Sequence, residues 1–155
     1  MSKILRRWSG TSISNHHRTD FSAGGVVVRS DEVIVIVPAR RGSTGGPVLA
    51  LPKGHPDGSE SELEAARREV REETGVEAEP VEKLGEITYT YERKGRPVDK
   101  RVAFYLFHYR SGELAHDHEI EEVRWMPLEE AAHALTYEGE RAMVKRALSR
   151  YGRDL

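Results

Sequence analysis

The sequence contains no cysteine and few aromatic residues, with Phe, Trp and Tyr making up 7% of 155 residues. The lack of cysteine excludes a disulfide framework, a thiolate zinc site and a cysteine nucleophile, and it fits a reducing compartment. The longest apolar runs, such as residues 33–37, are far too short to span a bilayer. We therefore expect a soluble, cytoplasmic protein.

The chain also lacks a strong excess of charge of either sign, because 24 Lys and Arg stand against 26 Asp and Glu, for a formal net charge of -2. Without a basic field over the whole chain, binding to DNA or to a membrane surface is disfavoured. The length and a hydrophobic content of 37% suit one domain with one core. Local groups of charge should matter more than the total.

The N-terminal segment differs in composition from the rest, because residues 1–19 include basic residues and no acid. It lacks the apolar block and cleavage site of a signal peptide. We expect an N-terminal extension over residues 1–20, loosely packed or mobile, followed by one folded domain over residues 21–155.

Several segments have the spacing of strands and helices. Runs rich in β-branched residues predict strands at 23–28 and 33–37, covered on both faces, and a short strand at 48–51. Ser61 and Glu64 form a capping-box pattern and Gly75 is a stop signal, which predicts a helix at 61–74. Further strands are expected at 86–93, 98–109 and 121–125, with a turn at 94–97 and helices from Pro127 and over 138–151. This order predicts an α/β fold, a mixed sheet with helices on both faces.

The predicted helix at 61–74 carries an unusual group of acids. Glu69, Glu72 and Glu73 are three and four residues apart, so their carboxylates project from one face within a single turn. Three like charges repel at that distance unless a cation lies among them, and an all-oxygen group suits Mg²⁺ or Mn²⁺. The alternative is a solvated acidic face screened by neighbouring arginines.

A second acidic group follows further along the chain and contains no base: Asp117, Glu119, Glu121 and Glu122. Two separated groups of carboxylates in a nearly neutral protein indicate two sides of one metal site. His116 and His118 flank the second group, but the hard oxygen donors argue against zinc.

The segment around the helix resembles the Nudix box, the pattern Gly-x5-Glu-x7-Arg-Glu-U-x-Glu-Glu-x-Gly-U with U aliphatic. Every fixed position is met: Gly54, Glu60, Arg68, Glu69, Val70, Glu72, Glu73, Gly75 and Val76. The resemblance extends from about residue 21 to residue 148, since the neighbouring strands and helices are expected where such proteins have theirs.

The resemblance implies a Nudix hydrolase with an α/β/α sandwich, a mixed β-sheet between helices. Such an enzyme hydrolyses a nucleoside diphosphate linked to another group, by attack of a metal-activated water on phosphorus, with Mg²⁺ or Mn²⁺. It implies metal ligation by Glu69, Glu72 and Glu73 with the backbone carbonyl of Lys53. Glu119 resembles the extra carboxylate of many relatives, acting as ligand or general base. Glu60 and Arg68 should brace the loop and helix through an ion pair. Gly54 should allow the turn into the loop, and Gly75 should allow the helix to end.

The flanking residues resemble the diadenosine polyphosphate hydrolase branch. Aromatic rings can stack on adenine and cations can bind extra phosphates, which gives a candidate substrate-binding set: Lys53, His55, Tyr89, Tyr91, Lys94 and Lys100. The alternatives are cross-strand packing for the tyrosines and solvation for the cations.

Other substrates stay open. Diphosphoinositol polyphosphate hydrolases would need the same positive residues without an aromatic stack. Enzymes acting on sugar nucleotides, ADP-ribose, oxidised guanosine triphosphates or RNA ends are further alternatives, as is a binding module that has the fold without catalysis. The implied partner is a small nucleotide, and the sequence identifies no protein partner.

Overall fold

The computed structural model describes residues 18–40, 42 and 45–151. Residues 1–17 of the expected N-terminal extension lie outside this range, whereas residues 18–20 form the start of the first strand. In chain order the elements are β1 (Arg18–Arg29), β2 (Glu32–Pro38), β3 (Lys53–Gly54), α1 (Glu62–Thr74), β4 (Glu77–Arg93), β5 (Arg96–Ser111), β6 (Ile120–Pro127), α2 (Leu128–Ala134) and α3 (Glu138–Tyr151).

The strands form one mixed sheet in the order β4-β5-β1-β2-β6, with β3 paired to β1. The β1–β5 pair is parallel, and the other pairs are antiparallel. The central strands are apolar throughout, and their side chains alternate between two cores. Val26 and Val28 face one core, while Val27 faces the other. Each such fully buried aliphatic side chain contributes roughly 1.5–3 kcal/mol to folding.

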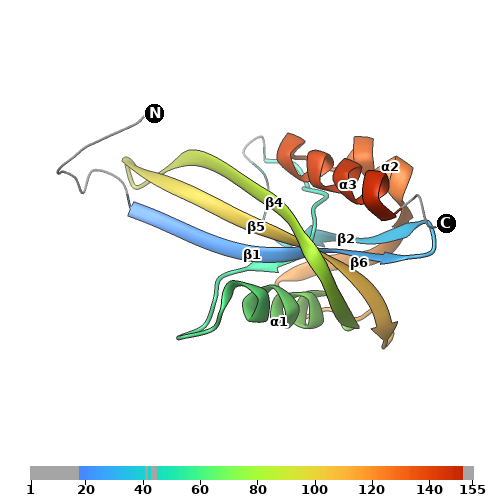
Figure 1. Cartoon of the computed structure of the whole chain (residues 1–155). Helices are drawn as coiled ribbons and strands as arrows, with labels where there is room; N and C mark the ends of the chain where they lie inside the picture. Colours follow the sequence, from blue (N-terminus) through green and yellow to red (C-terminus); the bar gives the residue numbers. More distant parts are fainter. Residues whose placement is uncertain (1–17, 41, 43–44, 152–155) are drawn as a thin grey trace.

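The helices cover both faces of the sheet, as the sequence predicts. Helix α1 packs on one face through Ala65, Ala66 and Val70. Helices α2 and α3 pack on the other through residues such as Leu128 and Val144, and Figure 1 shows the three layers edge-on. The expected α/β/α sandwich is therefore confirmed. No helix in the described part of the chain has both the length and the apolar character to cross a membrane.

Two expectations about strands were wrong. The segment 48–51 forms only an isolated bridge between Ala50 and Ile36. Its other backbone groups bond elsewhere, because Leu49 pairs with Thr136 and the Leu51 N–H donates to Glu140.

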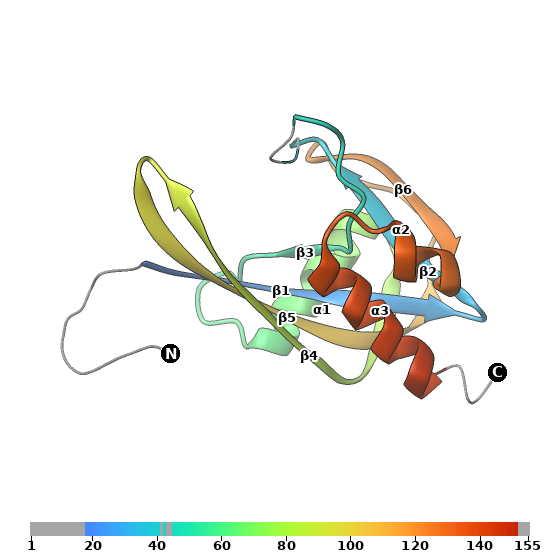
Figure 2. The same ribbon diagram turned by 90° about the horizontal axis from the view of Figure 1, so that it is seen from above.

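Strand β4 begins at Glu77, nine residues before the expected start at 86. Its first half contains Pro80 and several charged residues and shows irregular register, so the pairing with β5 decides its conformation. The paired β4 and β5 form a long hairpin that projects beyond the helices (Figure 2).

Candidate active site

Helix α1 is fixed at both ends by the residues that the sequence identified. The Ser61 hydroxyl accepts the Glu64 N–H at 3.1 Å, and the Glu64 carboxylate accepts the Ser61 N–H at 2.8 Å. Gly75 ends the helix at φ 82°, a left-handed conformation that favours glycine, and its N–H donates to the Arg71 carbonyl. The orientation of the carboxylate-bearing face is thereby set.

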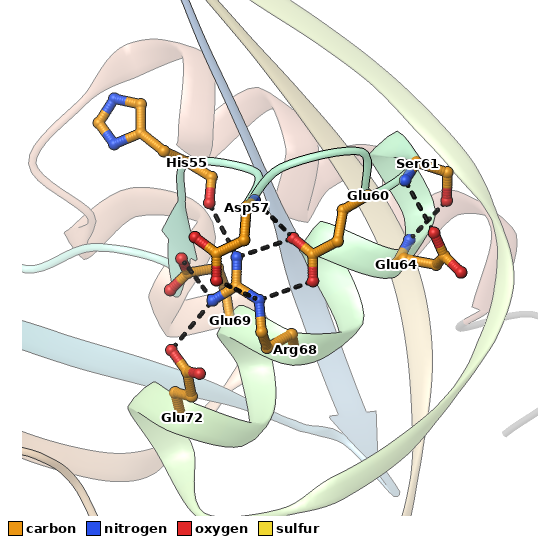
Figure 3. Close-up of polar contacts among 8 residues, drawn as sticks. All are labelled: His55, Asp57, Glu60, Ser61, Glu64, Arg68, Glu69 and Glu72. Carbon is orange, nitrogen blue, oxygen red and sulfur yellow. Dashed lines mark hydrogen bonds and ion pairs between the residues drawn. The ribbon is translucent and has the colours of Figure 1, made fainter.

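Arg68 is the centre of an ion-pair network between α1 and the loop before it (Figure 3). Its guanidinium donates two hydrogen bonds to Glu60, at 2.7 and 3.0 Å, and one to the His55 carbonyl at 2.8 Å. It also donates to Glu69 and Glu72. The hydrogen bond from Arg68, together with one from the Asp57 N–H, lowers the pKa of Glu60 to about 2. The expected ion pair between Glu60 and Arg68 is present.

Glu69 and Glu73 lie against strand β3. The Glu73 carboxylate accepts the Lys53 N–H at 3.1 Å. A side chain at Gly54 would place its Cβ 2.1 Å from the Glu69 carboxylate, so the close approach of Glu69 to β3 requires glycine there. Burial, the largest cause, raises the pKa of Glu69 and raises that of Glu73 to about 8.

The loop before β6 brings a second acidic residue toward this group. The Ala115 N–H donates to the Thr74 carbonyl at 2.9 Å, which fastens the loop to the end of α1. The charge of Asp117 contributes to the raised pKa of Glu73. Glu119 is exposed, and its N–H donates to the Asp117 carboxylate. The structure therefore brings Asp117, which was part of the second acidic group, near the α1 carboxylates.

The donor set fits a hard cation, although no three His, Asp or Glu side chains converge on one point within the described ranges. Glu69 and Glu73 are partly buried carboxylates, and the charge of Glu69 further raises the pKa of Glu73. A divalent cation would favour the ionised forms of both. In this arrangement the Arg68 guanidinium supplies the positive charge beside Glu69 and Glu72.

A pocket of about 340 Å³ opens between β1, the hairpin and the loops that follow β2, β3 and α2. Its lining residues are Asp20, Arg40, Gly42, His55, Tyr89, Tyr91, Glu92, Arg93, Lys100 and Tyr137. Four members of the candidate substrate-binding set, namely His55, Tyr89, Tyr91 and Lys100, thus share one pocket. Lys94 does not line it and lies in the turn between β4 and β5.

The three tyrosines of the pocket differ in their surroundings. Tyr91 donates its hydroxyl to Asp20, and the Arg93 guanidinium both donates to that hydroxyl and lies over the ring. Tyr89 and Tyr137 are 49% and 45% exposed, respectively. Tyr89 and Tyr137 are therefore exposed to the pocket, with the Tyr89 ring 6.3 Å from that of Tyr91, whereas Tyr91 belongs to a polar network.

Lys53 links the carboxylates to the pocket. Its ammonium pairs with the buried carboxylate of Glu140 on α3 at 3.0 Å. Burial alone would lower the pKa of Lys53, but the attraction of Glu140 outweighs it and the pKa is raised. The charge of Lys53 also acts on Tyr89 and Lys100. One residue thus contacts Glu73 through its backbone and lies near the pocket through its side chain.

Several residues of this region were not among the candidates from the sequence, including Asp20, Arg40, Arg93, Tyr137 and Glu140. Glu140 carried a usable signal, because it precedes Met143 and Val144 by three and four residues and so belongs to the apolar face of α3. The other four depend on strand register and loop packing, which leave no local pattern.

Comparison with known proteins agrees with this geometry. The family model of the NUDIX domain matches residues 18–147. The chain is 36% identical over 150 residues to MutT4 of Mycobacterium tuberculosis, covering 93% of this chain and 59% of that protein. It is 33% identical to an 8-oxo-(d)GTP phosphatase of Mycolicibacterium smegmatis, covering 65% of this chain and 30% of that one.

A third relative is the asymmetrical bis(5'-nucleosyl)-tetraphosphatase of Mus musculus, 32% identical over 61% of this chain and 65% of that protein. The chain therefore spans less than two thirds of the length of each of these relatives. A NUDIX hydrolase structure from Nitrosomonas europaea has the same fold, with a TM-score of 0.71 at 20% identity over 86% of this chain and 90% of that one. The chain belongs to the NUDIX domain family.

Proposed function

We propose that this chain is a metal-dependent pyrophosphohydrolase of small nucleotides, with diadenosine polyphosphates as its preferred substrates. The observation that carries this proposal is the position of Lys53. Its N–H binds Glu73 of the carboxylate group, and its side chain lies near a pocket with exposed aromatic rings and cations. A phosphate chain bound at the carboxylates through metal would have its nucleoside end within that pocket.

Glu69, Glu72 and Glu73, with the Lys53 carbonyl and Glu119, would hold Mg²⁺, or Mn²⁺ in its place. When bound, the cation polarises the attacked phosphorus and lowers the pKa of a coordinated water. Glu119 and Asp117 are the candidates for accepting a proton from the attacking water, because both belong to the loop packed on the end of α1.

Different residues of the pocket would bind the bases and the phosphates of such a substrate. The exposed side chains of Tyr89 and Tyr137 suit stacking on a purine, worth about 1–3 kcal/mol per base. Arg40, Arg93 and Lys100 supply positive charge for phosphates beyond the cleaved bond. A dinucleoside polyphosphate has both features, whereas a diphosphoinositol polyphosphate would leave the tyrosines unused.

The test is a product analysis in Mg²⁺ across diadenosine tetra-, penta- and hexaphosphate, diphosphoinositol pentakisphosphate, ADP-ribose and 8-oxo-dGTP. We expect the dinucleotides to be cleaved fastest, with release of ATP or a longer nucleotide. If another compound of the panel is cleaved faster, the assignment of diadenosine polyphosphates as substrates is wrong, while metal-dependent hydrolysis remains the proposed reaction. A tight dinucleotide complex that persists uncleaved in millimolar Mg²⁺ would instead indicate a binding module.

The role of the carboxylates is tested by Glu73→Gln. Glutamine keeps the shape of the side chain and can still accept the Lys53 N–H, so the fold should persist. We expect turnover to fall by at least about 100-fold, because a ligand of the cation is lost. Glu82→Gln, in an exposed ion pair with Arg150, is the matched control and should keep wild-type turnover. Ordinary activity of Glu73→Gln at limiting Mg²⁺ would contradict the proposal.

A second candidate is hydrolysis of an oxidised guanosine triphosphate. It is favoured by the 33% identity to the 8-oxo-(d)GTP phosphatase of Mycolicibacterium smegmatis, over 65% of this chain. Such a substrate needs one base site and no second nucleoside. Release of pyrophosphate from 8-oxo-dGTP, at a higher kcat/KM than release of ATP from diadenosine tetraphosphate, would favour this candidate.

A further inference from the structure

The Asp20 carboxylate contacts several of the polar side chains that line the pocket. Its Oδ1 lies 2.8 Å from His55 Nε2, and its Oδ2 accepts the Tyr91 hydroxyl at 3.0 Å and the Lys100 ammonium at 3.1 Å. The three partners come from the loop after β3, from β4 and from β5. The Arg93 guanidinium also lies 4.0 Å from Oδ2, so the carboxylate is the common partner of four groups that line the pocket.

The position of Asp20 follows from the parallel pairing of β1 with β5, in which Asp20 stands opposite Lys100. The Lys100 side chain is 8% exposed, and besides Asp20 its ammonium donates to the Ser22 hydroxyl at 2.6 Å. A lysine left free would extend its flexible stem into water. Here two acceptors on one strand hold the ammonium at the base of the pocket.

Burial and the contact between Asp20 and Lys100 shift the pKa values of both residues. Partial burial alone would raise the pKa of Asp20, but the hydrogen bond and charge of Lys100 outweigh it and the pKa is lowered. Burial, as the larger effect, lowers the pKa of Lys100 despite Asp20. The lowered pKa keeps Asp20 ionised, so Asp20 is a fixed anion in a pocket proposed to bind polyanions.

A fixed anion opposes phosphate binding by charge alone, so its presence requires another explanation. We propose that Asp20 is a positioning residue, which holds Lys100, His55 and Tyr91 in the single arrangement that binds substrate phosphates. This inference rests on the proposed function. It predicts that removing the Asp20 side chain with its contacts weakens the binding of a polyanion, although Coulomb's law alone would give stronger binding when a negative charge is lost.

The experiment measures kcat and KM for diadenosine tetraphosphate in Asp20→Ala, Asp20→Glu and Asp20→Asn. Alanine removes every contact of the carboxylate, so we expect KM to rise about tenfold with kcat changed by less than about threefold. Glutamate keeps the charge and displaces it by one methylene, so KM should rise as well. Asparagine keeps an acceptor for Lys100 and Tyr91, and its KM should stay within about threefold of the wild type.

Glu92→Ala is the matched control, because Glu92 lines the same pocket and its carboxylate has no hydrogen-bond or ion-pair partner among the described residues. Its removal changes the charge only, so KM should stay the same or fall by up to about twofold. If Asp20→Ala behaves like Glu92→Ala, or if Asp20→Glu keeps the wild-type KM, the inference is overturned. Asp20→Glu decides the matter if the alanine variant does not fold.

A double-mutant cycle with Lys100→Ala shows whether Asp20 acts through Lys100. We expect Asp20→Ala to raise KM less in the Lys100→Ala background than in the wild-type background, because the part of the effect that acts through Lys100 is then already lost. A purely structural role would raise KM equally in both backgrounds and would overturn the inference. If the wild type cleaves no compound of the substrate panel, both the proposed function and the inference about Asp20 are wrong. If the wild type cleaves and Glu73→Gln does not, only the inference is at stake.

Discussion

Two networks of ion pairs are built from the same residue types at very different distances along the chain. The local network surrounds Arg68, and the long-range network joins Asp20 to Lys100 and Lys53 to Glu140. Arg68 reaches partners no more than 13 residues away, such as Glu60 and the His55 carbonyl. Asp20 and Lys100 are 80 residues apart, and Lys53 and Glu140 are 87 apart. The first network is a property of one loop and one helix, whereas the second exists only after the sheet and α3 have assembled.

This difference has a consequence for stability. Contacts between distant segments are lost completely on unfolding, whereas a local loop and helix can keep part of their contacts in the unfolded ensemble. The long-range network also includes more deeply buried groups, since the Glu140 side chain is 3% exposed and that of Arg68 is 15% exposed. We therefore expect mutations of the long-range network to cost more stability than mutations of the local one.

The largest of these effects is expected for Glu140→Ala. The change removes the acceptor of the Leu51 N–H and leaves the Lys53 ammonium without its partner. Breaking a buried pair in this way should lower the free energy of unfolding by about 3 kcal/mol, measured by urea denaturation. Glu138→Ala, an exposed acid in the same turn, is the control and should change stability by less than about 0.5 kcal/mol.

Glu140→Gln sharpens this test, because glutamine can still accept the Leu51 N–H and loses only the charge. Its cost should lie between those of the alanine variant and the control. If Glu140→Ala is as mild as Glu138→Ala, the long-range network does not have the larger share of stability that the comparison assigns to it.

The sequence could predict the local network but not the long-range one. The limits of α1, the role of Gly75 and the Glu60–Arg68 pair follow from residue spacing within one segment, since helix geometry converts spacing into direction. Asp20 lies in β1 ahead of its apolar run and belongs to no local sequence pattern. Its partner Lys100 is set by the parallel register of β1 and β5, which depends on the whole sheet.

The same reasoning explains where the strand predictions were wrong. Residues 48–51 have the composition of a strand, but their backbone groups bond to Thr136 and Glu140 from another layer. Strand β4 starts among Glu, Pro and Lys residues that disfavour strands, and only its partner β5 makes it extended. In both cases tertiary contacts override local preference.

A smaller effect is expected for Arg68→Lys, which breaks the local network. Lysine keeps the charge but cannot make the two parallel hydrogen bonds to Glu60 while also reaching the His55 carbonyl. We expect a loss of about 1.5 kcal/mol in the free energy of unfolding, measured in the same urea series. Arg67→Lys on the exposed face of α1 is the matched control and should be nearly neutral. A cost greater than that of Glu140→Ala would reverse the ranking of the two networks.

The smallest effect is a pH dependence of the protein's stability that arises from Glu60 in the local network. Its pKa lies at about 2 in the folded protein, below the usual 4.5, because Arg68 and the Asp57 N–H bind the ionised form. A lowered folded pKa contributes stability that is fully present above pH 4.5 and is lost as the pH falls toward 2. The urea midpoint of the wild type should therefore exceed that of Glu60→Gln at pH 6, and the difference should shrink at pH 4 and again at pH 3. Glu79→Gln, from an exposed pair with Arg110, should differ little from the wild type at each pH. A difference for Glu60→Gln that stays constant from pH 6 to pH 3 would mean that the ionised carboxylate is not what braces the loop against α1.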